Sequence, residues 1–162
     1  MNDQELFYLF ALQRVEGVGD IIAKKLLTQL GTAELVFKAK SSQLAAIDGI
    51  GTILLKNFKD QSVFVKAERE LQFIASNPIT VTTFQDADYP ERLKHCFDSP
   101  LVLFSSGNID LKNQKTISIV GTRQITSYGL EFCKKLIEDV ASLNPVIVSG
   151  FAYGVDIVAH QL

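Results

Sequence analysis

The chain has 162 residues, of which 47% are apolar, and this length suits one domain or two small ones. Its 16 basic and 18 acidic residues give a net charge of −2, which excludes a strong overall attraction to nucleic acid or membranes, so any nucleic-acid site has to be local. No apolar run approaches the roughly 20 residues that span a bilayer. The two cysteines, Cys96 and Cys133, lie far apart, which is typical of a reduced, cytoplasmic protein and argues against a zinc site.

Residues 1–77 are predicted to form a small all-helical domain. Apolar residues recur at helical spacing in "DQELFYLFALQRV", "DIIAKKLLTQLG" and three later segments. The second of these segments closes on Gly31, a typical residue at the end of a helix.

Two stretches within this region, "RVEGVGDIIAKKLL" and "AIDGIGTILLKNF", have the helix-hairpin-helix pattern. Its glycines are expected to adopt backbone angles closed to other residues and to leave N–H groups that a phosphate can bind. Acidic residues beside the turns would weaken phosphate binding. The pattern is therefore compatible with DNA contact and also with a packing or partner-docking role. The accessory DNA contacts that the pattern indicates are Gly17, Gly19, Lys24, Gly49 and Gly51.

Residues 78–162 change in character. The segments "ITVTTF", "LVLFSSG", "TISIVG" and "VIVSG" are short and apolar, as strands are, whereas "SYGLEFCKKLIEDVASL" has helical periodicity. The order strand, helix, strand, helix from Thr116 onward predicts a parallel sheet with helices packed on it.

Two strand-to-helix turns are the candidate binding site, because ligands of parallel sheets bind at the carboxyl ends of the strands. The first turn contains Gly121, Thr122 and Arg123, whose guanidinium matches a phosphate. The turn carries neither the dinucleotide fingerprint nor a Walker motif, and we predict no cofactor.

The second turn, "VSGFAYG", is expected to lie beside the first. Ser149 and the N–H groups from Gly150 to Ala152 are predicted to bind a second phosphate. Phe151 and Tyr153 are candidates for base stacking, the alternative being that Phe151 packs inward and Tyr153 caps the helix.

No catalytic group or metal site is predicted. Asp156 and His160, spaced four residues apart, are compatible with a carboxylate that holds an imidazole and also with a structural hydrogen bond.

Three stretches, "YPERLKHCFDSPLVLFSSGN", "SIVGTRQITSYGLEF" and "VIVSGFAYGVDIVAH", follow in order. Together they resemble the motifs of the DNA-processing protein A (Smf) family, and the paired hairpins resemble that family's N-terminal helical domain. The resemblance implies an α/β fold, in which a helix-hairpin-helix domain at 1–77 precedes a Rossmann-like parallel sheet at 78–162 that is truncated and continues beyond residue 162. Many members have Arg where this chain has Tyr153, which removes one cation and adds a stacking surface.

The resemblance further implies a non-enzymatic, cytoplasmic protein that binds single-stranded DNA. Family members protect incoming strands and load the RecA recombinase in natural transformation. The resemblance implies phosphate binding by the Gly121–Arg123 turn and by Ser149 and Gly150. A sheet that ends after its second strand-helix unit exposes apolar surface, so we expect self-association, as a homodimer.

Two other functions stay open. A Rossmann-like enzyme of the phosphoribohydrolase type, which binds nucleoside phosphates and cleaves the base from the ribose, would need a P-G-G-x-G-T-x-x-E stretch, which these 162 residues lack. In the other alternative, the chain is only a protein-docking module, and the hairpin pair is its interface.

Overall fold

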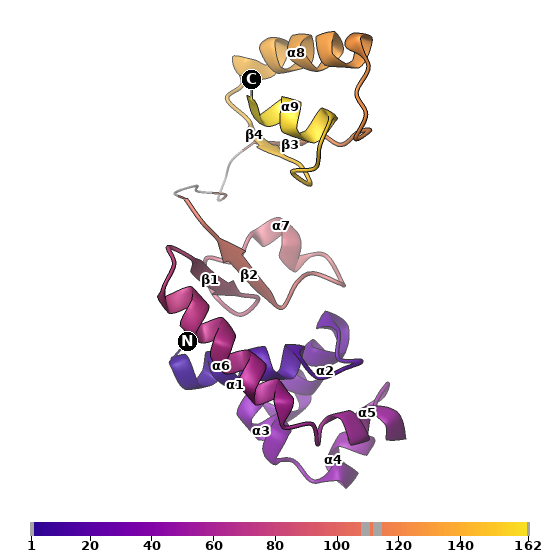
Figure 1. Cartoon of the computed structure of the whole chain (residues 1–162). Helices are drawn as coiled ribbons and strands as arrows, with labels where there is room; N and C mark the ends of the chain where they lie inside the picture. Colours follow the sequence, from indigo (N-terminus) through magenta and orange to yellow (C-terminus); the bar gives the residue numbers. More distant parts are fainter. Residues whose placement is uncertain (1, 108–110, 112–114, 162) are drawn as a thin grey trace. The chain divides into compact units, whose positions relative to one another are not determined.

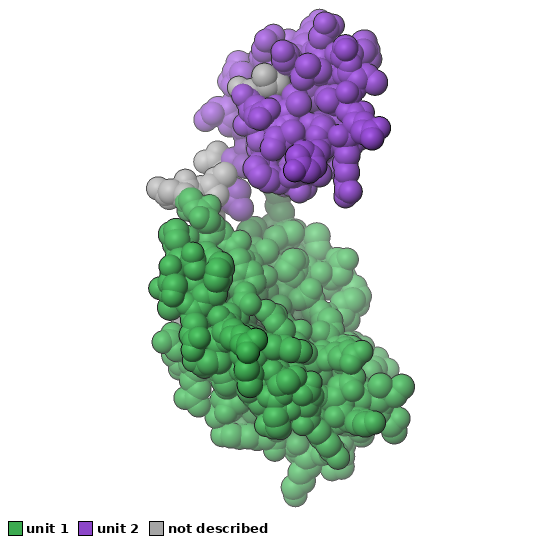
Figure 2. Space-filling view, viewed as in Figure 1, with its two compact units in different colours: residues 1–108 green, residues 109–162 purple. Residues whose placement is uncertain are grey.

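The computed structural model describes residues 2–107, 111 and 115–161. The chain folds as two compact units, residues 1–108 (unit 1) and 109–162 (unit 2) (Figures 1 and 2). In the described part of the chain, no helix has both the length and the apolar character that crossing a bilayer requires.

Unit 1 begins with helices, as the periodicity of residues 1–77 predicts. The first helix starts with a capping box, in which the Asn2 side chain accepts from the Glu5 N–H and the Glu5 carboxylate accepts from the Asn2 N–H. Phe10, Leu12 and Leu26 are fully buried in the core between the helices. The helices are α1 (Asp3–Gln13), α2 (Asp20–Leu30), α3 (Ala33–Lys38), α4 (Ser41–Ala45), α5 (Thr52–Asn57) and α6 (Ser62–Ala75).

The two hairpin turns pack against each other reciprocally. A Cβ placed on Gly17 would contact Leu54 of the second hairpin, and a Cβ placed on Gly49 would contact Ile22 of the first. Gly17 and Gly49 have φ values of 89° and 91°, which glycine adopts without strain. The glycine two residues after each of them has an ordinary extended backbone instead, with φ near −90°. The prediction that all four glycines need special angles is therefore wrong for Gly19 and Gly51.

A two-stranded antiparallel sheet completes unit 1. Strands β1 (Thr80–Thr83) and β2 (Val102–Ser105) pair antiparallel, with the short α7 (Glu91–Lys94) between them in the chain. The Leu101 N–H donates to the Asp20 carboxylate over 2.8 Å, and Leu101 lies in the same core as the helices. The predicted change from helix to strand near residue 78 therefore occurs within unit 1, and the division into domains 1–77 and 78–162 stays a prediction.

Unit 2 is the predicted strand-helix-strand-helix unit. Strands β3 (Thr116–Ser118) and β4 (Val146–Val148) pair in parallel, with Ile117 opposite Ile147. Helix α8 (Ser127–Ala141) follows β3, helix α9 (Val155–Gln161) follows β4, and the two helices pack together (Figure 1). The predicted parallel α/β arrangement is thus confirmed, and both connections from strand to helix lie at the carboxyl ends of the strands.

Candidate nucleic-acid interface

The two predicted turns meet at one edge of unit 2. The Val155 N–H donates to the Thr122 carbonyl over 3.1 Å, which joins the start of α9 to the turn after β3. Gly154 fits tightly at this junction, because a Cβ there would overlap the Thr122 carbonyl oxygen and lie 2.7 Å from the Arg123 carbonyl carbon. The φ of Gly154 is 85°. Only glycine satisfies both the close approach and this backbone angle.

The first turn presents a cation to solvent. The Gln124 N–H donates to the Thr122 hydroxyl over 3.1 Å, which holds the turn in shape. Thr126 then caps α8, since its hydroxyl accepts from the Gly129 N–H. Arg123 is exposed, and its guanidinium has no hydrogen-bond or ion-pair partner among the residues that the structure describes. The turn therefore leaves the Arg123 guanidinium accessible from solvent.

The second turn differs from its prediction, because its amides are already occupied. Asp156 is only 4% exposed, and its carboxylate accepts from the Gly150 N–H over 3.0 Å and from the Ala152 N–H over 3.5 Å. The Phe151 N–H donates to the Ser149 hydroxyl over 3.1 Å. The prediction of free N–H groups from Gly150 to Ala152 is thus wrong, since a carboxylate of the chain itself lies where the phosphate was expected.

Two aromatic side chains project from the second turn. Phe151 is 70% exposed and Tyr153 is 82% exposed, so the alternative in which Phe151 packs inward is wrong. Phe151 has a positive φ of 54°, which is uncommon outside glycine, and its ring lies 5.5 Å from the His160 ring. Base stacking on these rings stays a prediction, for which both side chains are accessible.

Asp156 and His160 both reach back to the turn that precedes α9. The His160 Nε2 and the Ser149 hydroxyl share a hydrogen bond of 2.7 Å, whereas Asp156 binds the turn amides. The spacing of the two residues predicts that they share a face of α9, but the turn as their common partner is visible only in the folded unit. The bond between Ser149 and His160 was not predicted, because no sequence motif signals it.

Two lysines of the first hairpin, Lys24 and Lys25, are paired with groups of the chain itself. The Lys24 ammonium donates to the Ser99 carbonyl and hydroxyl over 2.5 and 2.6 Å and lies 5.7 Å from the Phe84 ring centroid. It is therefore not free to bind a phosphate, contrary to the prediction. Lys25 forms an ion pair of 2.7 Å with Asp48 of the second hairpin, and this hydrogen bond lowers the pKa of Asp48. DNA contact through the hairpin glycines stays a prediction.

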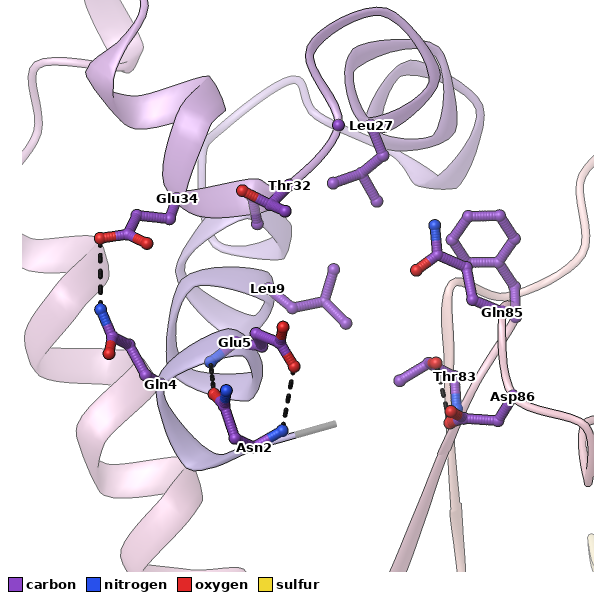
Figure 3. A pocket seen from close by; sticks show the side chains of 13 residues that line it. Asn2, Gln4, Glu5, Leu9, Leu27, Thr32, Glu34, Thr83, Gln85 and Asp86 are labelled. Carbon is purple, nitrogen blue, oxygen red and sulfur yellow. Dashed lines mark hydrogen bonds between the residues drawn. The ribbon is translucent and has the colours of Figure 1, made fainter.

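Unit 1 also contains a pocket of about 360 Å³ between the start of α1, the start of α3 and the turn after β1 (Figure 3). Three carboxylates line it, and each already accepts a hydrogen bond from within the chain. Glu5 accepts from Asn2, Glu34 from Gln4, and Asp86 from Thr83 (Figure 3). The three carboxylates therefore stabilise the local structure around the pocket through these hydrogen bonds. Among the described residues, no group of His, Cys, Asp and Glu is arranged to hold a metal ion.

The parallel strands, their two covering helices and the cationic turn at the carboxyl edge define an α/β protein of the Rossmann-like class. Residues 80–162, roughly half of the chain, match the model of a family described as DNA recombination-mediator protein A. The chain therefore belongs to this family.

Individual relatives agree with this assignment. The chain is 28% identical to Protein Smf of Synechocystis sp. over 99% of its own length and 42% of that protein. It is 31% identical to DNA processing protein DprA of Bacillus subtilis over 88% of its own length and 49% of that protein. The crystal structure of DNA processing protein A from Streptococcus pneumoniae shares the fold, with a TM-score of 0.60 at 22% identity over 99% of this chain and 53% of that one. The chain thus spans about half the length of the curated relatives it matches.

Proposed function

We propose that the protein binds single-stranded DNA without catalysing a reaction, protects incoming strands and loads the RecA recombinase onto them during natural transformation. Membership of the recombination-mediator family and relatives named DNA processing proteins support this role. We further propose that the protein acts in the cytoplasm.

The junction of the two turns is the observation that carries the proposal. The first turn carries the exposed Arg123, which has no hydrogen-bond or ion-pair partner among the described residues, and the second turn carries the exposed rings of Phe151 and Tyr153. The Val155 to Thr122 hydrogen bond joins the two turns. A cation with aromatic rings is the combination that binds a phosphate backbone together with accessible bases. Bases are accessible in this way only in an unpaired strand. Because Asp156 occupies the second turn, Arg123 is the main phosphate ligand of the proposal.

Substitution of Arg123 tests this role. Arg123→Ala is expected to weaken binding of a single-stranded oligonucleotide by about 1–3 kcal/mol, measured by fluorescence anisotropy. The dependence of affinity on salt is expected to become shallower, by about 0.7 in the slope of log K against log salt for each phosphate that the protein no longer neutralises. Arg69→Ala, which removes an exposed arginine from α6 in unit 1, is the matched control and is expected to change neither quantity.

Unchanged affinity and salt slope in Arg123→Ala would contradict the proposal. Equal affinity for duplex and single-stranded DNA would assign binding to the hairpins instead. Release of a free base from nucleoside monophosphates incubated with the protein would contradict the non-enzymatic role, and Ser149→Ala would then test the Ser149–His160 bond as its origin.

We also propose that the protein forms a homodimer. Val148 of β4 and Val120, two residues after β3, are exposed, whereas parallel sheets are usually covered on both faces. Sedimentation velocity over a range of concentrations is expected to show a dimer, and a monomer throughout that range would contradict this proposal.

A further inference from the structure

Helix α8 carries two large aromatic side chains on its outer surface. Tyr128 is 78% exposed and Phe132, one helical turn later, is 57% exposed. Their ring centroids lie 6.5 Å apart with an angle of 29° between the planes, so each ring keeps much of its area in contact with solvent. The opposite side of α8 provides the packing of the helix, since Cys133 is buried there. The pair therefore leaves aromatic surface accessible to a ligand.

A lysine extends this aromatic face. Lys135 lies three residues after Phe132 and seven after Tyr128, a spacing that places all three on one side of the helix. We call Tyr128, Phe132 and Lys135 the α8 stripe. All three side chains are exposed or partly exposed. Asp139 follows one turn later on the same side and Glu131 borders the stripe, and both carboxylates reduce the attraction of the stripe for an anion.

The α8 stripe follows the Arg123 turn directly along the chain. Thr126 caps α8 only three residues after Arg123, so the helix starts directly from the turn that presents the guanidinium. Arg123, the two rings and Lys135 thus follow one another along the chain and alternate in chemistry between cation and aromatic surface. Proteins that bind single strands combine these two features, since cations follow the backbone and rings stack on the bases.

We infer that the α8 stripe is a base-stacking platform that extends the Arg123 site. A strand held at Arg123 by one phosphate places its next bases on Tyr128 and Phe132, and Lys135 contacts a further phosphate. This inference rests on the proposed function, and it adds DNA contacts that lie outside the two predicted turns.

Tryptophan fluorescence provides a direct test, because the chain contains no tryptophan. Phe132→Trp introduces a single fluorophore in the stripe, and stacking of thymine bases is expected to quench it as oligothymidylate binds. Phe73→Trp is the matched control, since Phe73 is 58% exposed on α6 in unit 1. Its fluorescence is expected to stay unchanged. Equal quenching in both variants, or no quenching in Phe132→Trp while anisotropy reports binding, would overturn the inference.

Affinity measurements separate stacking from phosphate binding. The double variant Tyr128→Ala with Phe132→Ala is expected to bind oligothymidylate about tenfold or more weakly, as the loss of one or two stacked bases implies. An abasic oligonucleotide of the same length carries the same phosphates, and the double variant is expected to bind it as well as the parent chain does. Phe73→Ala is the control on the normal oligonucleotide. Circular dichroism melts, expected to be unchanged, show that the exposed substitutions preserve folding.

The two proposals fail in different ways in this experiment. Parental affinity of the double variant for oligothymidylate, combined with weakened binding of both oligonucleotides by Arg123→Ala, would overturn the stacking platform and leave the proposed function standing. Parental affinity in both variants would overturn both. Equal losses on normal and abasic oligonucleotides in the double variant would also overturn the platform, since bases would not be what it contacts.

Discussion

At the scale of single residues, Asp156 determines the chemistry of the second turn. Its buried carboxylate accepts from two turn amides, so removing it leaves the Gly150 and Ala152 N–H groups without that partner. Asp156→Ala is expected to lower the free energy of unfolding by about 1–3 kcal/mol, measured by urea denaturation. The exposed Asp139 on α8 provides the control, and Asp139→Ala is expected to change stability by less than about 0.5 kcal/mol. Similar losses in both variants would show that the turn does not depend on this carboxylate.

Gly154 determines whether the two turns can meet. In Gly154→Ala the new methyl group overlaps the Thr122 carbonyl and the residue keeps a strained φ, so we expect lower stability and an oligonucleotide affinity reduced to that of Arg123→Ala. Gly107→Ala is the matched control, because Gly107 has a φ of 97° but open space around its Cβ position. It is expected to cost about 1–2 kcal/mol of stability through strain alone and to bind normally. Normal DNA binding by Gly154→Ala would show that contact between the turns is not required.

At the scale of elements, the ion pair between Lys25 and Asp48 links the two hairpins. The hydrogen bond and charge of Lys25 lower the pKa of Asp48 in the folded protein, so the pair stabilises the fold above the ordinary carboxyl pKa. This stabilisation is lost as the pH falls through the lowered pKa. Lys25→Met is expected to return the pKa of Asp48 toward its ordinary value, measured by carboxyl NMR titration.

Asp60 is the internal control for that titration. Its pKa is also lowered, but by hydrogen bonds from Ser62, so it is expected to stay low in Lys25→Met. A parallel rise at Asp60 would indicate a general change of structure, and an unchanged Asp48 would contradict the link between the hairpins.

Local sequence patterns predict the elements of unit 2 but not the long-range packing of unit 1. Periodicity and turn residues predict β3, α8, β4 and α9 in order, because each depends on neighbours in sequence. The docking of β1 and β2 on the helices depends on contacts between residues that are far apart in the sequence. Lys24 and Ser99 are separated by 75 positions, and Asp20 and Leu101 by 81 positions. No local pattern encodes such pairs. The same limit applies to the candidate site, where glycines and Arg123 are visible in the sequence but the capture of turn amides by Asp156 requires the folded turn.

At the scale of the whole molecule, the two units differ in how much core they contain. The large cluster of buried apolar residues runs from Leu9 to Val102 and lies entirely in unit 1. In unit 2, the buried apolar side chains of the described residues are Ile119, Cys133 and Ala159. Small cores stabilise a fold only marginally. Urea unfolding followed by tryptophan fluorescence is therefore expected to occur at a lower concentration in Phe132→Trp, which reports on unit 2, than in Phe73→Trp, which reports on unit 1. Coincident transitions would show that the chain unfolds as one cooperative unit.

The different environments of the two thiols have a practical consequence. Cys96 is exposed in unit 1, whereas Cys133 is buried on the inner side of α8 in unit 2. A maleimide dye is therefore expected to label the native chain at one sulfur, remote in sequence from both turns. With a tryptophan at the exposed Leu143 of unit 2 (Leu143→Trp) as the energy donor and this dye as the acceptor, Förster transfer would measure how the separation of the units responds when single-stranded DNA is added.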